Sequence, residues 1–119
     1  MAQEKGFVTK DLEAILKITL INGSQIECAL DTGFNGFLLL PRTFIVTNSL
    51  PFVGNELVTM VEQNKTEVEV VAGQVIWLNE KLPVRILVSE NDECLIGTQM
   101  LADSKLEIDY KNFTVKITK

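Results

Sequence analysis

Histidine is missing from this sequence of 119 residues. Without imidazole the chain cannot form a Ser–His or Cys–His nucleophile pair, and it has neither an imidazole metal ligand nor an imidazole acid–base group. Carboxylates remain as the side chains suited to proton transfer, so any hydrolytic chemistry would fall to Asp or Glu.

Cysteine is scarce as well, since the chain has only Cys28 and Cys94. Two cysteines so far apart are too few for a disulfide framework or a zinc site. We interpret both as small buried apolar side chains of a protein in a reducing compartment.

Basic clusters and long apolar runs are lacking too. The 11 Lys and Arg residues face 16 Asp and Glu residues, which gives a net charge of −5. Binding to a phosphate backbone relies on several cationic contacts, so nucleic acid is not an expected partner. No apolar run approaches the roughly 18 residues of a membrane span, and no leader pattern opens the sequence. We expect a soluble, cytoplasmic protein that needs no metal or other cofactor.

The residues that are present indicate one compact, mostly β domain. The composition is 46% hydrophobic and 23% charged, which is ordinary for a globular domain. Apolar and polar residues alternate over 16–20 and again over 25–30, and Asn22-Gly23 between them predicts a hairpin. A similar alternation over 106–110 and 113–117 predicts a second hairpin near the C-terminus.

Further strands are expected between these two hairpins. Residues 56–61 and 67–70 form a third hairpin around the polar segment Glu62-Gln63-Asn64-Lys65, and 82–88 supply another strand. Short helical stretches are expected over 41–48 and 98–103, with Thr98 capping the second.

We expect residues 1–13 to form an exposed N-terminal arm and 14–119 to form the domain. Trp77 is expected in the core, whereas Asp92-Glu93 is expected in a loop and Glu67 and Glu69 on a solvent-facing strand.

One carboxylate stands out by its position. Asp31 follows the apolar residues Ala29-Leu30, and a second apolar run, 37–40, comes shortly after it. An aspartate between two apolar segments is expected to be partly buried and to need hydrogen bonds. Thr32 offers a hydroxyl that could brace the loop, and Gly33 lets backbone N–H groups approach the carboxylate. The alternative is an ordinary Asx turn between two strands, without a function.

A second motif lies about sixty residues later, where Leu95-Ile96-Gly97 follows Cys94. Together, Ala29-Leu30-Asp31-Thr32-Gly33-Phe34 and Cys94-Leu95-Ile96-Gly97, followed by Met100-Leu101, resemble the retropepsin-like aspartic proteases. The final segments Leu106–Tyr110 and Phe113–Val115 are similar to the last strands of that family. Phe34 after the glycine, followed by Asn35-Gly36-Phe37, is similar to a prokaryotic branch of the family.

The resemblance implies a mostly β, closed retropepsin-like β-barrel over 14–119, with one short helix near the C-terminus. It implies that Asp31 is catalytic and is supported by Thr32, Gly33, Phe34, Leu95, Ile96 and Gly97. Because the chain has one Asp-Thr-Gly motif and the chemistry needs two carboxylates, a homodimer would pair Asp31 with its copy. Such a dyad shares one proton, as in aspartic proteases generally, and would cleave a peptide or protein substrate without a metal.

The hairpin over 56–70 occupies the place of the family's flap, with Glu62, Gln63, Asn64 and Lys65 near its tip. This tip is polar and charged, whereas the flaps of the viral enzymes are glycine-rich. Asn35 and Thr98 stand where viral members usually carry an acidic residue and an arginine. Two alternatives to a protease therefore stay open: a catalytically silent dimer of this fold that serves as a binding or dimerisation module, and a monomeric β-barrel with an accidental Asp-Thr-Gly.

Overall fold

The computed structural model describes residues 2–59 and 65–119. Within them the chain forms ten strands, one α-helix and one 3₁₀ turn. In chain order these are β1 (Gln3–Val8), β2 (Ala14–Leu20), β3 (Gln25–Leu30), β4 (Leu38–Pro41), α1 (Arg42–Thr47), β5 (Phe52–Thr59), β6 (Lys65–Trp77), β7 (Glu80–Ser89), β8 (Leu95–Ile96), the 3₁₀ turn η2 (Thr98–Leu101), β9 (Lys105–Asp109) and β10 (Thr114–Thr118).

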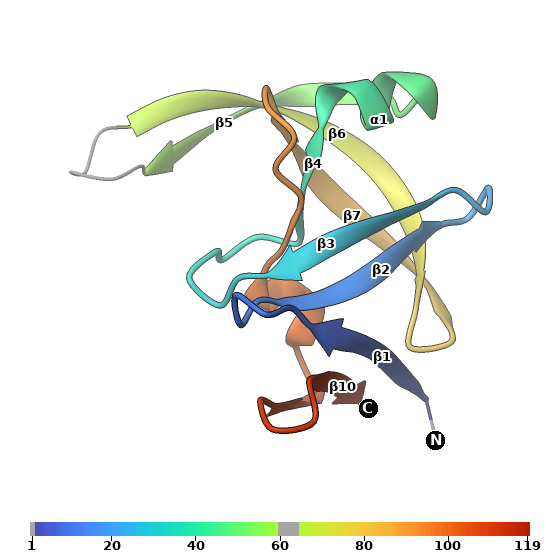
Figure 1. The fold of residues 1–119 in the computed structure, drawn as a ribbon. Helices are drawn as coiled ribbons and strands as arrows, with labels where there is room; N and C mark the ends of the chain where they lie inside the picture. Colours follow the sequence, from blue (N-terminus) through green and yellow to red (C-terminus); the bar gives the residue numbers. More distant parts are fainter. Residues whose placement is uncertain (1, 60–64) are drawn as a thin grey trace.

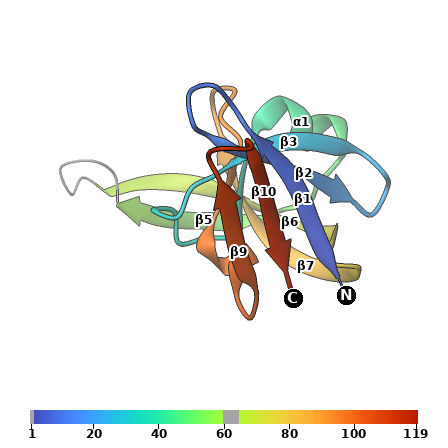
Figure 2. The same ribbon diagram turned by 60° about the horizontal axis from the view of Figure 1, so that its bottom comes forward.

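All ten strands belong to one sheet with the order β5-β6-β7-β4-β8-β3-β2-β1-β10-β9. An additional pairing between β2 and β6, through Thr19 with Ile76 and Leu20 with Val75, closes part of this sheet into a ring. The β5–β6 hairpin extends away from the ring, and β1, β10 and β9 lie side by side at the other end of the strand order (Figures 1 and 2).

The ring encloses a core of aliphatic side chains. Leu16 and Ile18 of β2 point inward together with residues of β4, β7 and β8, because alternate residues of a strand face the same side. The core members with less than 2% exposure are Leu16, Ile18, Leu38, Leu40, Ile86, Ile96, Ile117, Val70, Val75, Val115 and Cys28. Each buried Leu, Ile or Val stabilises the fold by about 1.5–3 kcal/mol relative to an exposed one.

The two hairpins expected from alternation and turn residues are confirmed. β2 pairs antiparallel with β3, and Gly23 in the connecting turn has a φ of 94°, in the left-handed region that favours glycine. β9 and β10 likewise pair antiparallel across residues 110–113. The expected hairpin around 62–65 is present as β5 and β6, although Glu62, Gln63 and Asn64 lie outside the described residues.

Two features of the sheet were not expected from the sequence. Residues 3–8, which fall within the predicted N-terminal arm, form β1 and pair with both β10 and β2. β6 and β7 are joined by Leu78-Asn79, whose φ values of 50° and 64° make a tight hairpin turn without glycine. The Leu78 N–H donates to Glu4 Oε2 at 2.8 Å, so β1 stabilises this turn.

The helical expectations are met in part. The stretch 41–48 contains α1, with Pro41 at its N-cap position. The second stretch forms only η2, and the prediction that Thr98 caps it is wrong, because Gly97 is the N-cap residue and no side chain caps the turn. The α-helix among the described residues, α1, lies mid-chain, and the short helix near the C-terminus is the 3₁₀ helix η2. None of the described helices is long and apolar enough to cross a membrane.

Candidate active site

Asp31 lies at the end of β3, where it is half-buried. Its backbone N–H donates to the Ile96 carbonyl oxygen at 3.0 Å, and its carbonyl oxygen accepts the Phe34 N–H at 3.1 Å. The carboxylate is held by the Gly33 N–H, which donates to Asp31 Oδ1 at 2.9 Å. The hydrogen bond expected from the glycine backbone is thus present, and the local geometry is an Asx turn anchored to β8.

The Leu95-Ile96-Gly97 segment lies directly beside this loop. β8 pairs parallel with β3, which places Leu95 beside Ala29 and Ile96 beside Leu30. Beyond β8 three backbone bonds continue the attachment: Gly97 N–H to the Phe37 oxygen at 2.9 Å, Thr98 N–H to the Phe34 oxygen at 2.9 Å, and Gln99 N–H to the Gly36 oxygen at 3.1 Å. The two motifs of the sequence therefore form one hydrogen-bonded unit.

Glycine is required at position 97 by close packing. Gly97 is buried, and a β-carbon there would overlap the Gly36 carbonyl oxygen and lie 2.8 Å from Phe34 Cδ2. The ring of Phe34 also covers Gly36, where a β-carbon would lie 2.8 Å from Cε1. Phe34 thus packs between the Asp31 loop and the segment after β8.

The Thr32 side chain does not brace the loop in the way that was expected. Thr32 is exposed, and within residues 2–59 and 65–119 its hydroxyl forms no hydrogen bond. The Gly33 N–H supplies the bond to the carboxylate instead. Asn35 is also exposed, and Thr98 contributes its backbone N–H to the loop.

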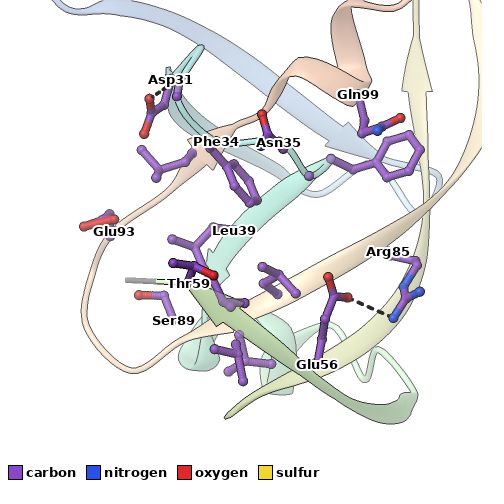
Figure 3. A pocket seen from close by; sticks show the side chains of 18 of the residues that line it. Asp31, Phe34, Asn35, Leu39, Glu56, Thr59, Arg85, Ser89, Glu93 and Gln99 are labelled. Atoms are coloured by element: carbon purple, nitrogen blue, oxygen red, sulfur yellow. Dashed lines mark hydrogen bonds and ion pairs between the residues drawn. The ribbon is translucent and has the colours of Figure 1, made fainter. Parts of the chain in front are cut away.

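A cleft of about 880 Å³ opens beside Asp31 (Figure 3). Its walls come from the 31–37 loop, β5, β7 and the 89–93 loop. Leu39, Leu87 and Leu95 give it an apolar surface, and Glu56 accepts a 3.0 Å salt bridge from Arg85 within it. A concave site with apolar walls and a few convergent polar groups is the usual form of a ligand-binding site.

The β5–β6 hairpin, which includes the predicted flap, contributes to this cleft. Glu56, Leu57, Val58 and Thr59 of β5 and Val68 of β6 line it. Of the predicted flap-tip residues, Lys65 begins β6, is exposed and pairs with Thr59. Glu62, Gln63 and Asn64 are outside the part of the chain that the structure describes.

Arg42 joins three elements close to the cleft. It forms a salt bridge of 3.0 Å to Glu69 of β6 and a bidentate contact with Glu90 after β7, with Nε to Oε1 at 2.8 Å. Hydrogen bonding to the guanidinium holds the pKa of the Glu90 carboxyl below its ordinary value. The expectation that Glu69 faces only solvent missed this contact, since nothing in the local sequence links positions 42, 69 and 90.

The two cysteines lie near each other beside the site. Cys28 is buried and precedes Ala29, whose N–H donates to the Cys94 oxygen at 3.0 Å. Burial raises the pKa of the Cys28 thiol, as expected of an unreactive side chain. Cys94 is only partly buried, so the expectation of two buried cysteines holds for Cys28 alone. Among the described residues, no group of three His, Cys, Asp or Glu is placed to hold a metal ion.

Sequence reasoning also missed Glu93. Glu93 lies in a loop, as expected. This loop forms one wall of the cleft, and Glu93 is among the residues that line it. The signal available in the sequence was its spacing, because Glu93 precedes Leu95 by two residues and alternate residues of an extended segment share a side.

Comparison with known proteins places the fold. The sequence matches no family model and no curated protein. Among solved structures, a retropepsin-like aspartic protease from Rickettsia conorii is similar over 97% of this chain and 89% of its own, with 17% identity and a TM-score of 0.69. A foamy viral protease-reverse transcriptase, solved in complex with an RNA/DNA hybrid, matches 80% of this chain and 13% of its own, with 16% identity and a TM-score of 0.58. The chain has a mostly β, retropepsin-like fold, as predicted.

Proposed function

We propose that this protein is an aspartic endopeptidase that acts as a homodimer, with Asp31 as its catalytic residue. The observation that carries the proposal is the position of Asp31. It ends a core strand, its carboxylate accepts the Gly33 N–H at 2.9 Å, and it lines a cleft of about 880 Å³. The retropepsin-like fold of the chain supports the same chemistry. Assignment to a prokaryotic branch of the family stays a prediction.

The dimer follows from the chemistry. Activating a water against a peptide carbonyl needs a base and an acid, and each chain brings one Asp-Thr-Gly. Two Asp31 carboxylates meeting across a two-fold axis at ~3 Å would repel by about 5 kcal/mol if both were ionised, so they would hold one proton between them. The residues proposed to support this pair are Gly33, Phe34, Leu95, Ile96 and Gly97. Thr32 is proposed to do so through its place in the loop, since its exposed hydroxyl forms no hydrogen bond among the described residues.

The proton-sharing pair defines the reaction. The ionised carboxylate takes a proton from water, which attacks the peptide carbonyl, while the protonated carboxyl donates to the carbonyl oxygen. The roles reverse when the amine leaves. Activity requires the singly protonated pair, so the rate should be highest in the acidic range and fall on both sides of it.

The test compares the wild type with Asp31→Asn on an unstructured protein substrate between about pH 4 and 7. Asn keeps the shape of the side chain but cannot accept the proton, so cleavage should fall by at least about 10³-fold. Asp92→Asn, which removes an exposed carboxylate that does not line the cleft, is the matched control. No cleavage by the wild type would favour the alternative, a silent module that binds or dimerises, and equal cleavage by Asp31→Asn would reject Asp31 as catalytic.

A further inference from the structure

The ionisable residues that line the cleft are Asp31, Glu56, Arg85, Glu90 and Glu93. Two of these carboxylates have a cationic partner, because Glu56 pairs with Arg85 at 3.0 Å and Glu90 pairs with Arg42, which it shares with Glu69. Glu93 is exposed, and among the described residues it forms no ion pair. Apart from Asp31 itself, Glu93 is thus the carboxylate in the cleft wall that has no described cation as a partner.

Glu93 stands next to an apolar surface. It precedes Leu95 by two residues, and both line the cleft together with Leu39. The Glu93 N–H donates to Asn91 Oδ1 at 2.9 Å, and Asn91 Oδ1 in turn accepts the Ser89 hydroxyl at 2.7 Å, which fixes the loop. In Figure 3 Glu93 and Asp31 are drawn toward one end of the cleft, and the Glu56–Arg85 pair is drawn toward the other.

A carboxylate beside leucine side chains can bind a long basic side chain of a peptide. The methylene stem of Lys or Arg packs on an apolar surface while its charged end reaches a polar partner. An acidic peptide side chain beside Glu93 would be repelled by its carboxylate. A neutral side chain would gain no charge attraction to Glu93. The net charge of −5 also favours the approach of cationic peptides.

We propose that Glu93 determines specificity, so that the cleft selects peptides with Lys or Arg near the scissile bond. The inference rests on the proposed function for the location of that bond. Leu95 pairs with Ala29, and Asp31 is two residues beyond Ala29. Glu93 comes two residues before Leu95, in the segment that precedes β8, so it lies at most about 13 Å from Asp31 measured along the strand direction. An extended peptide advances ~3.3 Å per residue, which puts the preferred basic residue within about four positions of the bond. In a two-fold dimer each chain supplies one Glu93, so the preference extends to both sides of the bond.

The experiment uses peptide sets that differ only by Lys, Gln or Glu at one position within this range. For the wild type, kcat/KM should follow the order Lys, Gln, Glu, with about five-fold or more between steps, and raising the salt concentration should compress the differences. Glu93→Gln should bring the Lys-to-Gln ratio close to one, and Glu93→Lys should reverse the order. Trp77, the single tryptophan, reports by its fluorescence that each variant is folded.

The matched control is Asp92→Lys, which makes the same charge change one residue away, outside the cleft lining. It should keep the wild-type order, and a reversal as large as that of Glu93→Lys would overturn the assignment to Glu93. Peptide affinity is also measured on Asp31→Asn, so the preference is tested even if no peptide is cut. Failure of the wild type to cut any peptide counts against the proposed protease. Equal affinity of Asp31→Asn for the Lys, Gln and Glu peptides overturns the present inference alone.

Discussion

Gly97 shows how a single residue without a side chain holds the candidate site together. Its neighbours leave no space, since a β-carbon would overlap the Gly36 carbonyl oxygen and lie 2.8 Å from the Phe34 ring. The colliding oxygen belongs to the backbone and cannot rotate away. The same Gly36 oxygen accepts the Gln99 N–H at 3.1 Å, so any shift there disturbs the attachment of the Asp31 loop to η2.

We therefore expect Gly97→Ala to lower the free energy of unfolding by at least about 2 kcal/mol, as measured in a denaturant titration. Gly33→Ala is the matched control from the same loop, where the nearest atom to an added β-carbon is Asp31 Oδ1 at 3.2 Å, a side-chain atom that can move. It should cost less than about 1 kcal/mol. Equal losses in the two variants would contradict the packing argument.

Among single residues, the sequence predicted those whose contacts are made with residues nearby in the chain. Asp31 with Gly33 could be recognised because the carboxylate and the N–H that binds it are two residues apart. The core position of Trp77 was also predicted and is confirmed, with 3% exposure and its indole N–H donating to the Met100 oxygen at 3.0 Å. The pairing of Arg42 with Glu69 and Glu90 could not be predicted, since it depends on which strands become neighbours in three dimensions.

At the scale of elements, Arg42 connects α1 with β6 and with the loop after β7. Its contacts with Glu90 hold the pKa of that carboxyl below the ordinary value of 4.5. A group whose pKa is lowered in the folded protein binds more protons in the unfolded one. Its contribution to stability is therefore complete above pH 4.5 and is lost as the pH falls through the lowered pKa of the folded protein.

Arg42→Gln should remove this contribution, so that the free energy of unfolding falls less steeply as the pH drops below 4.5. Arg42→Lys keeps the charge but not the paired N–H donors, and it should give an intermediate slope. Thermal unfolding at a series of pH values provides the measurement. A slope in Arg42→Gln as steep as that of the wild type would show that Arg42 does not set the titration of Glu90.

The difference between local and distant pairing also explains which elements the sequence predicted. The β2–β3 and β9–β10 hairpins are encoded within about twenty residues each, by alternation and a turn. The parallel pairing of β3 with β8 joins segments some 65 residues apart, and only the resemblance to a family indicated that they meet. Burial alternates along β1, but its sequence shows no matching alternation of apolar and polar residues, because two of the less exposed positions are Glu4 and Gly6. Gly6 lies under the Ile15 oxygen, where a side chain would collide.

At the scale of the whole molecule, each chain has a single Asp-Thr-Gly motif and therefore supplies a single carboxylate of this type. If two chains complete one site, activity depends on the concentration of dimers and not of chains. Dilution should therefore lower the activity per chain as dimers dissociate, and sedimentation should show the mass decreasing over the same concentration range.

Mixing subunits tests this dependence directly. An inactive Asp31→Asn chain that still dimerises should capture wild-type chains into mixed dimers with a single competent carboxylate. At a constant amount of wild type, random exchange with an equal amount of Asp31→Asn should lower activity to about half, and a nine-fold excess should lower it to about a tenth. A folded chain that does not dimerise would leave activity unchanged at every ratio, and in that case a site shared between two copies would have to be abandoned, because each wild-type chain would be working alone.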